Sequence, residues 1–159
     1  MRKTLVALVT VAVAALIWAF VSSAAGASAS AAKTTRLFAK MDSRQVVTPK
    51  NRSWKAPASV ARAKGTFAGT LNSTTRKLIW RITYTGLRRG ATYVDLHIGK
   101  PGRFGPIIVR LCKQCKSGES GVTRVRRVFV DQIASANSWV TVLTTAYPNG
   151  VIRGQIRLR

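Results

Sequence analysis

The chain has few of the side chains on which most enzymes and metal sites depend. Its 159 residues include 1 His, 2 Cys and 4 Asp or Glu. Hydrolysis by paired carboxylates needs two acids a few ångströms apart, and the four acids are scattered. A Ser-His-Asp set built from His97 and Asp95 would take both from one strand, and no G-x-S-x-G motif is present. We therefore predict no catalytic residues and no cofactor.

The two cysteines, Cys112 and Cys115, stand in the sequence CKQC. A tetrahedral zinc site needs about four ligands, and the chain has no second cysteine pair. A thioredoxin-like motif is expected beside a βαβ unit, whereas CKQC follows a strand-like run and precedes a loop. In an oxidising compartment the spacing indicates a local disulfide that closes a tight turn. A redox-active pair is the alternative, and it predicts a reactive thiol.

The N-terminus has the pattern of an export signal. Arg2 and Lys3 precede an apolar run over 5–21, and a tract of small residues with A-x-A patterns follows. This pattern predicts a signal peptide over 1-31, with an uncleaved membrane anchor as the alternative. Cleavage leaves 32-159, the length of one domain, with a loosely ordered start. We expect a secreted protein, extracellular or in the cell envelope.

Acidic residues are scarce while basic residues are abundant. The chain carries 27 Lys and Arg; without Arg2 and Lys3, 25 remain against 4 acids, a net charge of +21. Such a charge favours anionic partners such as nucleic acid, acidic polysaccharide, wall polymers or anionic lipid. Heptads, zinc-ligand spacing and a helix-turn-helix pattern are missing, which disfavours sequence-specific nucleic-acid binding. The alternative is a solvated basic surface without a partner.

Alternating short segments predict an all-β chain. The clearest strand is KLIWRITYTG, which places Leu78, Trp80, Ile82 and Tyr84 on one face. Residues 33–63 lack this period, and within them QVVTPKNRSWKAPAS reads as an edge strand and a loop. VTRVRRVFV reads as a further strand, and DQIASAN as the single helical turn. The pattern predicts an antiparallel Greek-key-like β-sandwich of about seven or eight strands.

Two stretches resemble the signatures of chordin-type (CHRD) domains. AYPNGVIRGQI at 146–156 is similar to the P-x-G-x-I-R-G-Q run that ends these domains. DLHIGKPGRFGPIIVRL at 95–111 is similar to their central H-I-H-x-G-x-x-G-x-x-G-P run. The resemblance covers roughly 36–158. It implies an extracellular β domain of undefined molecular role, found alone in secreted bacterial proteins and as repeats in chordin-like regulators.

The chain departs from that resemblance at two histidine positions. Asp95 stands where the family commonly has a first histidine, and Leu143 stands where it has a third. Three imidazoles suit zinc or copper, but His97 alone does not replace them. We therefore predict no metal, and a polar pair of Asp95 and His97 on one sheet face. Arg153 matches the family's I-R-G arginine; it is expected to satisfy carbonyls or a carboxylate, with anion binding as the alternative.

These observations predict a non-catalytic, secreted binding module. Its partner is expected to be an anionic extracellular polymer or a protein, with Arg153, Asp95 and His97 as candidate binding residues. Membrane contact is expected only if the N-terminal segment stays uncleaved. The alternatives are a passive structural envelope protein, or a metal-binding β-sandwich with a degenerate histidine site.

Overall fold

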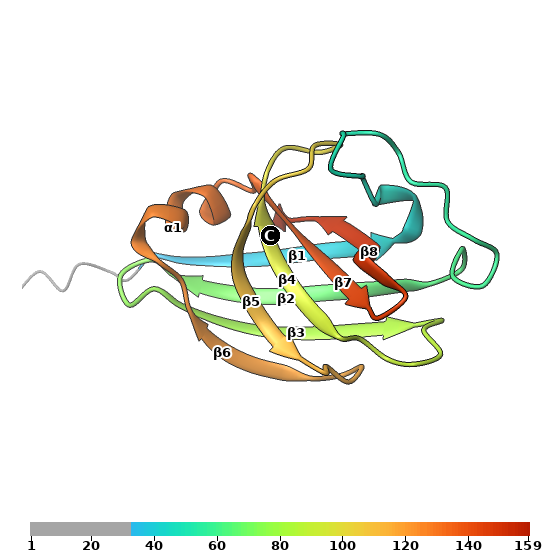
Figure 1. Cartoon of the computed structure of the whole chain (residues 1–159). Helices are drawn as coiled ribbons and strands as arrows, with labels where there is room; N and C mark the ends of the chain where they lie inside the picture. The colour runs from blue at the N-terminus through green and yellow to red at the C-terminus, as the bar shows by residue number, and fades with distance from the viewer. Residues whose placement is uncertain (1–32) are drawn as a thin grey trace, which may run out of the picture. The chain divides into compact units, whose positions relative to one another are not determined.

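The structure, a computed structural model, describes residues 33–159, so the signal peptide expected over 1-31 lies outside the described residues. The domain is almost entirely β (Figure 1). Within the described part of the chain, no helix is long and apolar enough to cross a membrane. The elements are β1 (Thr34–Asp42), η1 (Ser43–Gln45), β2 (Lys64–Asn72), β3 (Lys77–Thr85), β4 (Tyr93–Ile98), β5 (Ile107–Lys113), β6 (Ser120–Arg124), α1 (Arg127–Ala134), β7 (Ser138–Thr144), β8 (Tyr147–Gln155) and β9 (Arg157–Leu158).

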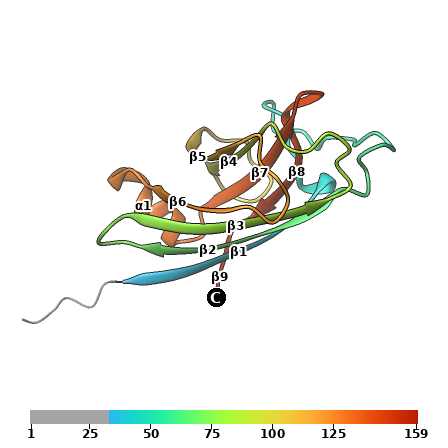
Figure 2. The same cartoon turned by 90° about the horizontal axis from the view of Figure 1, so that it is seen from below.

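The strands form two layers, which lie one behind the other in Figure 1 and one above the other in Figure 2. Their order is β5-β4-β7-β8-β1-β2-β3-β6, with β9 on β1, and the paired strands run antiparallel. β8 meets β1 through a single pair, Asp42 with Arg153, and the sheet path passes there from one layer to the other. The connections from β3 to β4 and from β6 to β7 also cross between layers. The predicted all-β sandwich is confirmed, with nine strands rather than seven or eight.

Alternation along the strands builds the core between the layers. On β3, Leu78 and Ile82 are fully buried while Ile79 and Arg81 are exposed. On β4, Val94 and Leu96 point into the same core. Because side chains alternate between the two faces of a strand, the residues between these core positions lie on the outer faces. Those outer faces carry the candidate sites.

The start of the domain differs from the expectation. All nine residues of β1 pair with β2, and Leu37, Ala39 and Met41 are buried in the core. β1 is thus an inner strand between β2 and the β8–β9 side. Residues 46–63 form the long connection, with one isolated bridge from Val47 to Ser53.

The prediction of a strand over 122–130 is wrong beyond Arg124. α1 begins at Arg127, with Val130 and Ile133 buried. In a strand, Val128 and Val130 would share a face, but Val128 is 68% exposed and Val130 only 6%. Buried residues three positions apart are typical of a helix. Val130 and Ile133 thus form the face of α1 that packs against the core.

The cysteines form the local disulfide that their spacing predicts. Cys112 at the end of β5 is bonded to Cys115, with sulfur atoms 2.05 Å apart. The Tyr84 hydroxyl donates to the Cys115 carbonyl at 2.5 Å, and the Gln114 amide donates to the Thr92 carbonyl at 2.8 Å. The short loop is therefore tied to β3 and to the start of β4.

Candidate functional site

The outer face of the β4-β7-β8 layer gathers the polar residues singled out in the sequence. Asp95 and His97 alternate with core residues on β4, so both project outward. His97 pairs with Trp139 on β7, and Thr141 two residues on pairs with Arg153 on β8. The register thus brings Asp95, His97 and Arg153 onto one face, and it adds Trp139.

Trp139 is the centre of a stacked cluster. The His97 imidazole lies parallel to the Trp139 rings, with centroids 3.8 Å apart and 9° between the planes. The Arg153 guanidinium lies 3.8 Å from the Trp139 ring centroid. Because β7 runs between β4 and β8, the indole lies between the other two groups. All three residues are at most 5% exposed.

The loop 99–106 covers this cluster and is held by its side chains. His97 Nδ1 donates to the Gly105 carbonyl at 2.8 Å, which leaves Nε2 as the unprotonated nitrogen. Arg153 Nη2 donates to the Arg103 carbonyl at 2.8 Å, and Gln155 Nε2 donates to the Gly99 carbonyl at 3.1 Å. Arg153 therefore satisfies carbonyls rather than a carboxylate.

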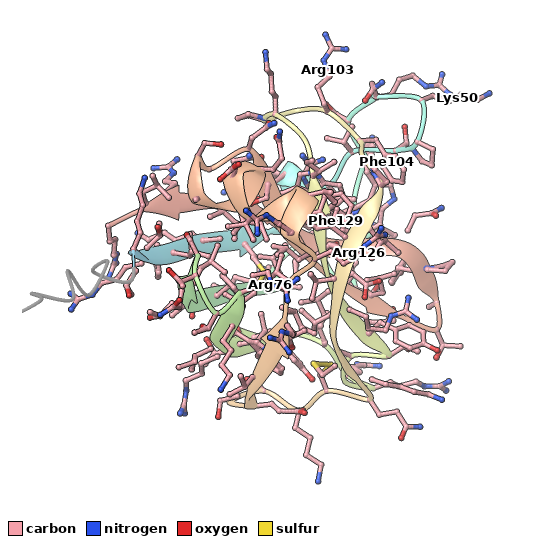
Figure 3. All side chains as sticks on the ribbon, turned by 90° about the vertical axis from the view of Figure 1, so that its left-hand side faces the viewer. Lys50, Arg76, Arg103, Phe104, Arg126 and Phe129 are labelled. Carbon is pink, nitrogen blue, oxygen red and sulfur yellow. A yellow bond between two sulfur atoms is a disulfide. The ribbon has the colours of Figure 1, made fainter. Side chains whose placement is uncertain are left out.

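Glycine permits the close fit of this loop. At Gly105 a Cβ atom would collide with the Ile98 carbonyl oxygen. A second loop joins the cover, because the Phe104 amide donates to Asn51 Oδ1 at 2.8 Å. Figure 3 shows Lys50, Arg103 and Phe104 together at this end of the domain. The glycine spacing in the central motif thus serves to lay a loop over the stacked cluster.

Asp95 is paired with an arginine rather than with His97. Its carboxylate is fully buried and accepts from Arg110 Nε at 3.0 Å and Nη2 at 3.3 Å. Arg110 also lies over the Tyr93 ring at 3.9 Å. The hydrogen bond to Asp95 raises the pKa of Arg110 above its ordinary value. Asp95 and His97 share a face, as predicted, but their hydrogen bonds go to different partners.

Burial sets the protonation of the cluster. Desolvation lowers the pKa of His97 below its ordinary value, although the Gly105 carbonyl and the Asp95 charge partly oppose this. Desolvation also lowers the pKa of Arg153 to about 10. At neutral pH the cluster therefore holds a neutral imidazole and a charged guanidinium.

Residues 37–156 match the model of the CHRD domain family. The chain belongs to the CHRD family. No curated protein and no solved structure matches the chain. CHRD domains are in general non-enzymatic and occur in extracellular proteins.

The histidine positions of this CHRD domain do not fit a zinc or copper ion. Leu143 offers no ligand atom, and the Asp95 carboxylate is already bound by Arg110. His97 uses Nδ1 on the Gly105 carbonyl, so only Nε2 is left as a donor to a metal. One imidazole nitrogen does not hold such an ion. The nearby grouping of Cys112, Cys115 and Glu119 fails as well, because both sulfur atoms are in the disulfide.

The opposite face of the CHRD domain carries a second candidate site. Outward residues of β1, β2, β3 and β6 alternate with core residues, and pairing places them in rows across the layer. We call this surface the basic face. Its exposed cations are Arg36, Lys40, Lys64, Lys77, Arg81, Arg124, Arg157 and Arg159.

The sequence alone missed this gathering of charge and the role of Trp139. The basic residues look evenly scattered along the chain, because β1, β2, β3, β6 and β9 come from distant segments. The available signal was alternation: Arg36, Phe38 and Lys40 lie opposite the buried Leu37, Ala39 and Met41. Without the strand order, the sequence does not show that these short alternating runs contribute to one surface.

Proposed function

We propose that this CHRD domain is a non-catalytic, extracellular binding module for anionic polymers, and that the basic face binds them. The observation that carries the proposal is eight exposed cations on one sheet face. At its margin, the carboxylate of Asp42 already accepts hydrogen bonds from the Arg44 and Gln45 amides and from Gln45 Nε2.

The excess of cations over carboxylates on the basic face supports an anionic partner. In the described domain the ion pairs are Arg110 with Asp95 and the long contact of Arg44 with Asp42 at 3.9 Å. The cations of the basic face are not neutralised by carboxylates within residues 33–159. A surface of one sign attracts oppositely charged polymers and accelerates their association.

Export of the protein, which the sequence predicts, would place the basic face where acidic polymers occur. The N-terminal pattern of a signal peptide and the local disulfide both suit an oxidising, extracellular setting. Acidic polysaccharides and wall polymers are abundant outside cells, so the basic face would meet its partner there.

The test is a titration of the mature domain, 32-159, against heparin, double-stranded DNA and neutral dextran at low and high salt. We expect saturable binding to the polyanions and none to dextran. About five displaced counterions predict a slope near −4 for log affinity against log salt.

A passive structural protein would show no saturable binding to any polymer even at low salt, and this outcome would overturn the proposal. Binding of a protein partner by shape, in contrast to binding of these polymers by charge, would depend little on the salt concentration. That result would move the function to another surface of the domain.

A further inference from the structure

We infer that the basic face binds one extended chain of an acidic polysaccharide, in a groove that follows β2; this inference rests on the proposed function. The groove has small residues on its floor, and larger or charged residues on the strands at either side. We call it the β2 groove.

The β2 groove follows from the register of three strands. The outward residues in the middle of β2 are Thr66, Ala68 and Thr70. They stand in rows between β1 and β3: Lys40 with Thr66 and Thr83, Phe38 with Ala68 and Arg81, and Arg36 with Thr70 and Ile79. Small side chains on the middle strand, between larger ones on β1 and on most of β3, leave a depression.

Two hollows occupy this depression. One has a volume of about 340 Å³ and is lined by Arg36, Phe38, Ala68, Ile79 and Arg81, among others. The second has a volume of about 650 Å³ and lies toward Lys40, Lys64 and Thr66. Both are bordered by β1, β2 and β3, so one follows the other along the strands. Arg159 borders the first, and Arg44 and Arg62 border the second.

The dimensions suit a single polymer chain. Neighbouring strands lie about 4.8 Å apart, so the walls on β1 and β3 are roughly 10 Å apart. The nine residues of β2 span about 26 Å at roughly 3.3 Å per residue. A duplex does not enter such a groove, since the major groove of B-DNA alone is about 12 Å wide.

The chemistry of the β2 groove favours sugars over bases. Thr66 and Thr83 hydroxyls lie 2.6 Å apart on the open face, and they offer hydrogen bonds to sugar hydroxyls. Ile79, 57% exposed, offers an apolar contact for a ring face. Binding of single-stranded nucleic acid depends on aromatic stacking. Phe38, the aromatic residue among the outward positions of these strands, is covered by the Arg159 guanidinium at 4.0 Å.

The experiment compares two variants of equal charge by calorimetric titration with a heparin oligosaccharide. The groove variant is Arg36→Gln, Lys40→Gln and Arg81→Gln. The control variant carries Lys50→Gln, Arg52→Gln and Arg103→Gln, exposed residues of the two loops that cover the stacked cluster. Figure 3 labels Lys50 and Arg103. Loss of three charge-assisted contacts should lower the affinity of the groove variant for the oligosaccharide by about tenfold or more. The affinity of the control variant should fall by less than about threefold.

A second pair of variants changes the groove without changing charge. Ala68→Phe fills the floor of the β2 groove from an exposed position, and Ala68→Ser leaves it open. We expect Ala68→Phe to weaken binding of the oligosaccharide by at least about fivefold, or roughly 1 kcal/mol. Ala68→Ser should stay within about twofold of the wild type.

The outcomes separate this inference from the proposed function. Wild-type binding with equal losses in both charge variants, or with an unchanged Ala68→Phe, overturns the β2 groove and leaves polyanion binding intact. No binding by the wild type overturns both. If single-stranded DNA binds as tightly as the oligosaccharide and is equally sensitive to Ala68→Phe, the assignment to polysaccharide is wrong.

Discussion

His97 is a titratable side chain that lies buried between the outer face of the sheet and the loop 99–106. Its ring lies against Trp139, and Nδ1 holds the loop 99–106 through Gly105. Nε2 is buried and has no hydrogen-bond partner within the described domain. A proton added to Nε2 would place a second buried cation close to Arg153. Burial also removes water from the charged ring, and this desolvation is the main reason that the pKa of His97 lies below its ordinary value; protonation therefore opposes the folded state.

The pH dependence of stability follows from that lowered pKa. Unfolded His97 binds a proton near pH 6.5 while the folded protein does not, so the unfolded state gains protons first. The free energy of unfolding should be constant above about pH 7 and should fall below about pH 6.5 by up to about 1.4 kcal/mol per pH unit, until the folded pKa is reached. Urea denaturation between pH 5 and pH 8 measures it.

His97→Gln is the control for this dependence. Because the chain has a single histidine, the variant should lose the slope between pH 5 and 6.5. An equal slope in both proteins would show that His97 is not the group responsible.

Arg153, a candidate binding residue in the sequence, makes its contacts inside the domain. It is 2% exposed, it holds the carbonyl of Arg103, and it stacks on Trp139. These contacts use its cationic and planar character inside the domain. Its position under a loop makes it unsuited to contact a large anionic polymer directly.

At the scale of elements, strand alternation proved a better guide than local composition. The sequence predicts β3 because apolar residues stand at every second position, and the structure buries each of them. The helical turn predicted at DQIASAN begins four residues earlier, at Arg127. Residues 127–130 were taken for the end of a strand because VTRVRRVFV is rich in β-branched residues, and such preferences depend on context. The burial of Val130 and Ile133, which decides the helix, is a property of the packed layers.

The disulfide loop is expected to add little to stability. The bond between Cys112 and Cys115 spans three residues in sequence, and a short loop restricts the unfolded chain only slightly. Replacing both cysteines by serine should lower the free energy of unfolding by less than about 2 kcal/mol, from the chain-entropy relation. Thermal unfolding of the oxidised, reduced and doubly substituted proteins measures this.

The same proteins, assayed for thiol reactivity and disulfide exchange, address the redox alternative. A structural disulfide predicts that the unreduced protein has no reactive thiol and does not speed the reduction of a test disulfide. A measurable exchange activity that disappears in the double serine variant would instead indicate a redox function.

At the scale of the whole molecule, the dominant feature is uncompensated positive charge. Residues 32–159 carry a net charge of +21, with 25 Lys and Arg against 4 acids, and eight of these cations lie on the basic face. Mutual repulsion destabilises a compact state of such charge. Salt screens charges beyond roughly 10 Å at 0.1 M ionic strength, so added salt should stabilise the fold.

We expect the Tm of the mature domain to rise by about 3 to 6 °C between low and moderate NaCl, which corresponds to roughly 1 kcal/mol of relieved repulsion. Differential scanning calorimetry measures this. The groove variant with three fewer charges should show a smaller rise. A Tm that is flat or falls with salt would mean that the cations repel each other too weakly to matter.

The candidate sites were predictable to different degrees. Asp95 and His97 were expected to share a sheet face because two residues apart on a strand always do. Their partners, Arg110 for Asp95 and Trp139 for His97, come from neighbouring strands. Strand order and register set those contacts, and no local pattern reports them.

The sequence by itself determined the β class, the family, the local disulfide and the excess of positive charge. Each of these is written in short patterns or in composition, so no distant contact is needed. Only the tertiary structure decided which cations share a surface, because β1, β2, β3 and β6 become neighbours through pairing. It also decided that Arg153 donates to carbonyls of the loop 99–106, since that depends on how this loop folds over β7 and β8.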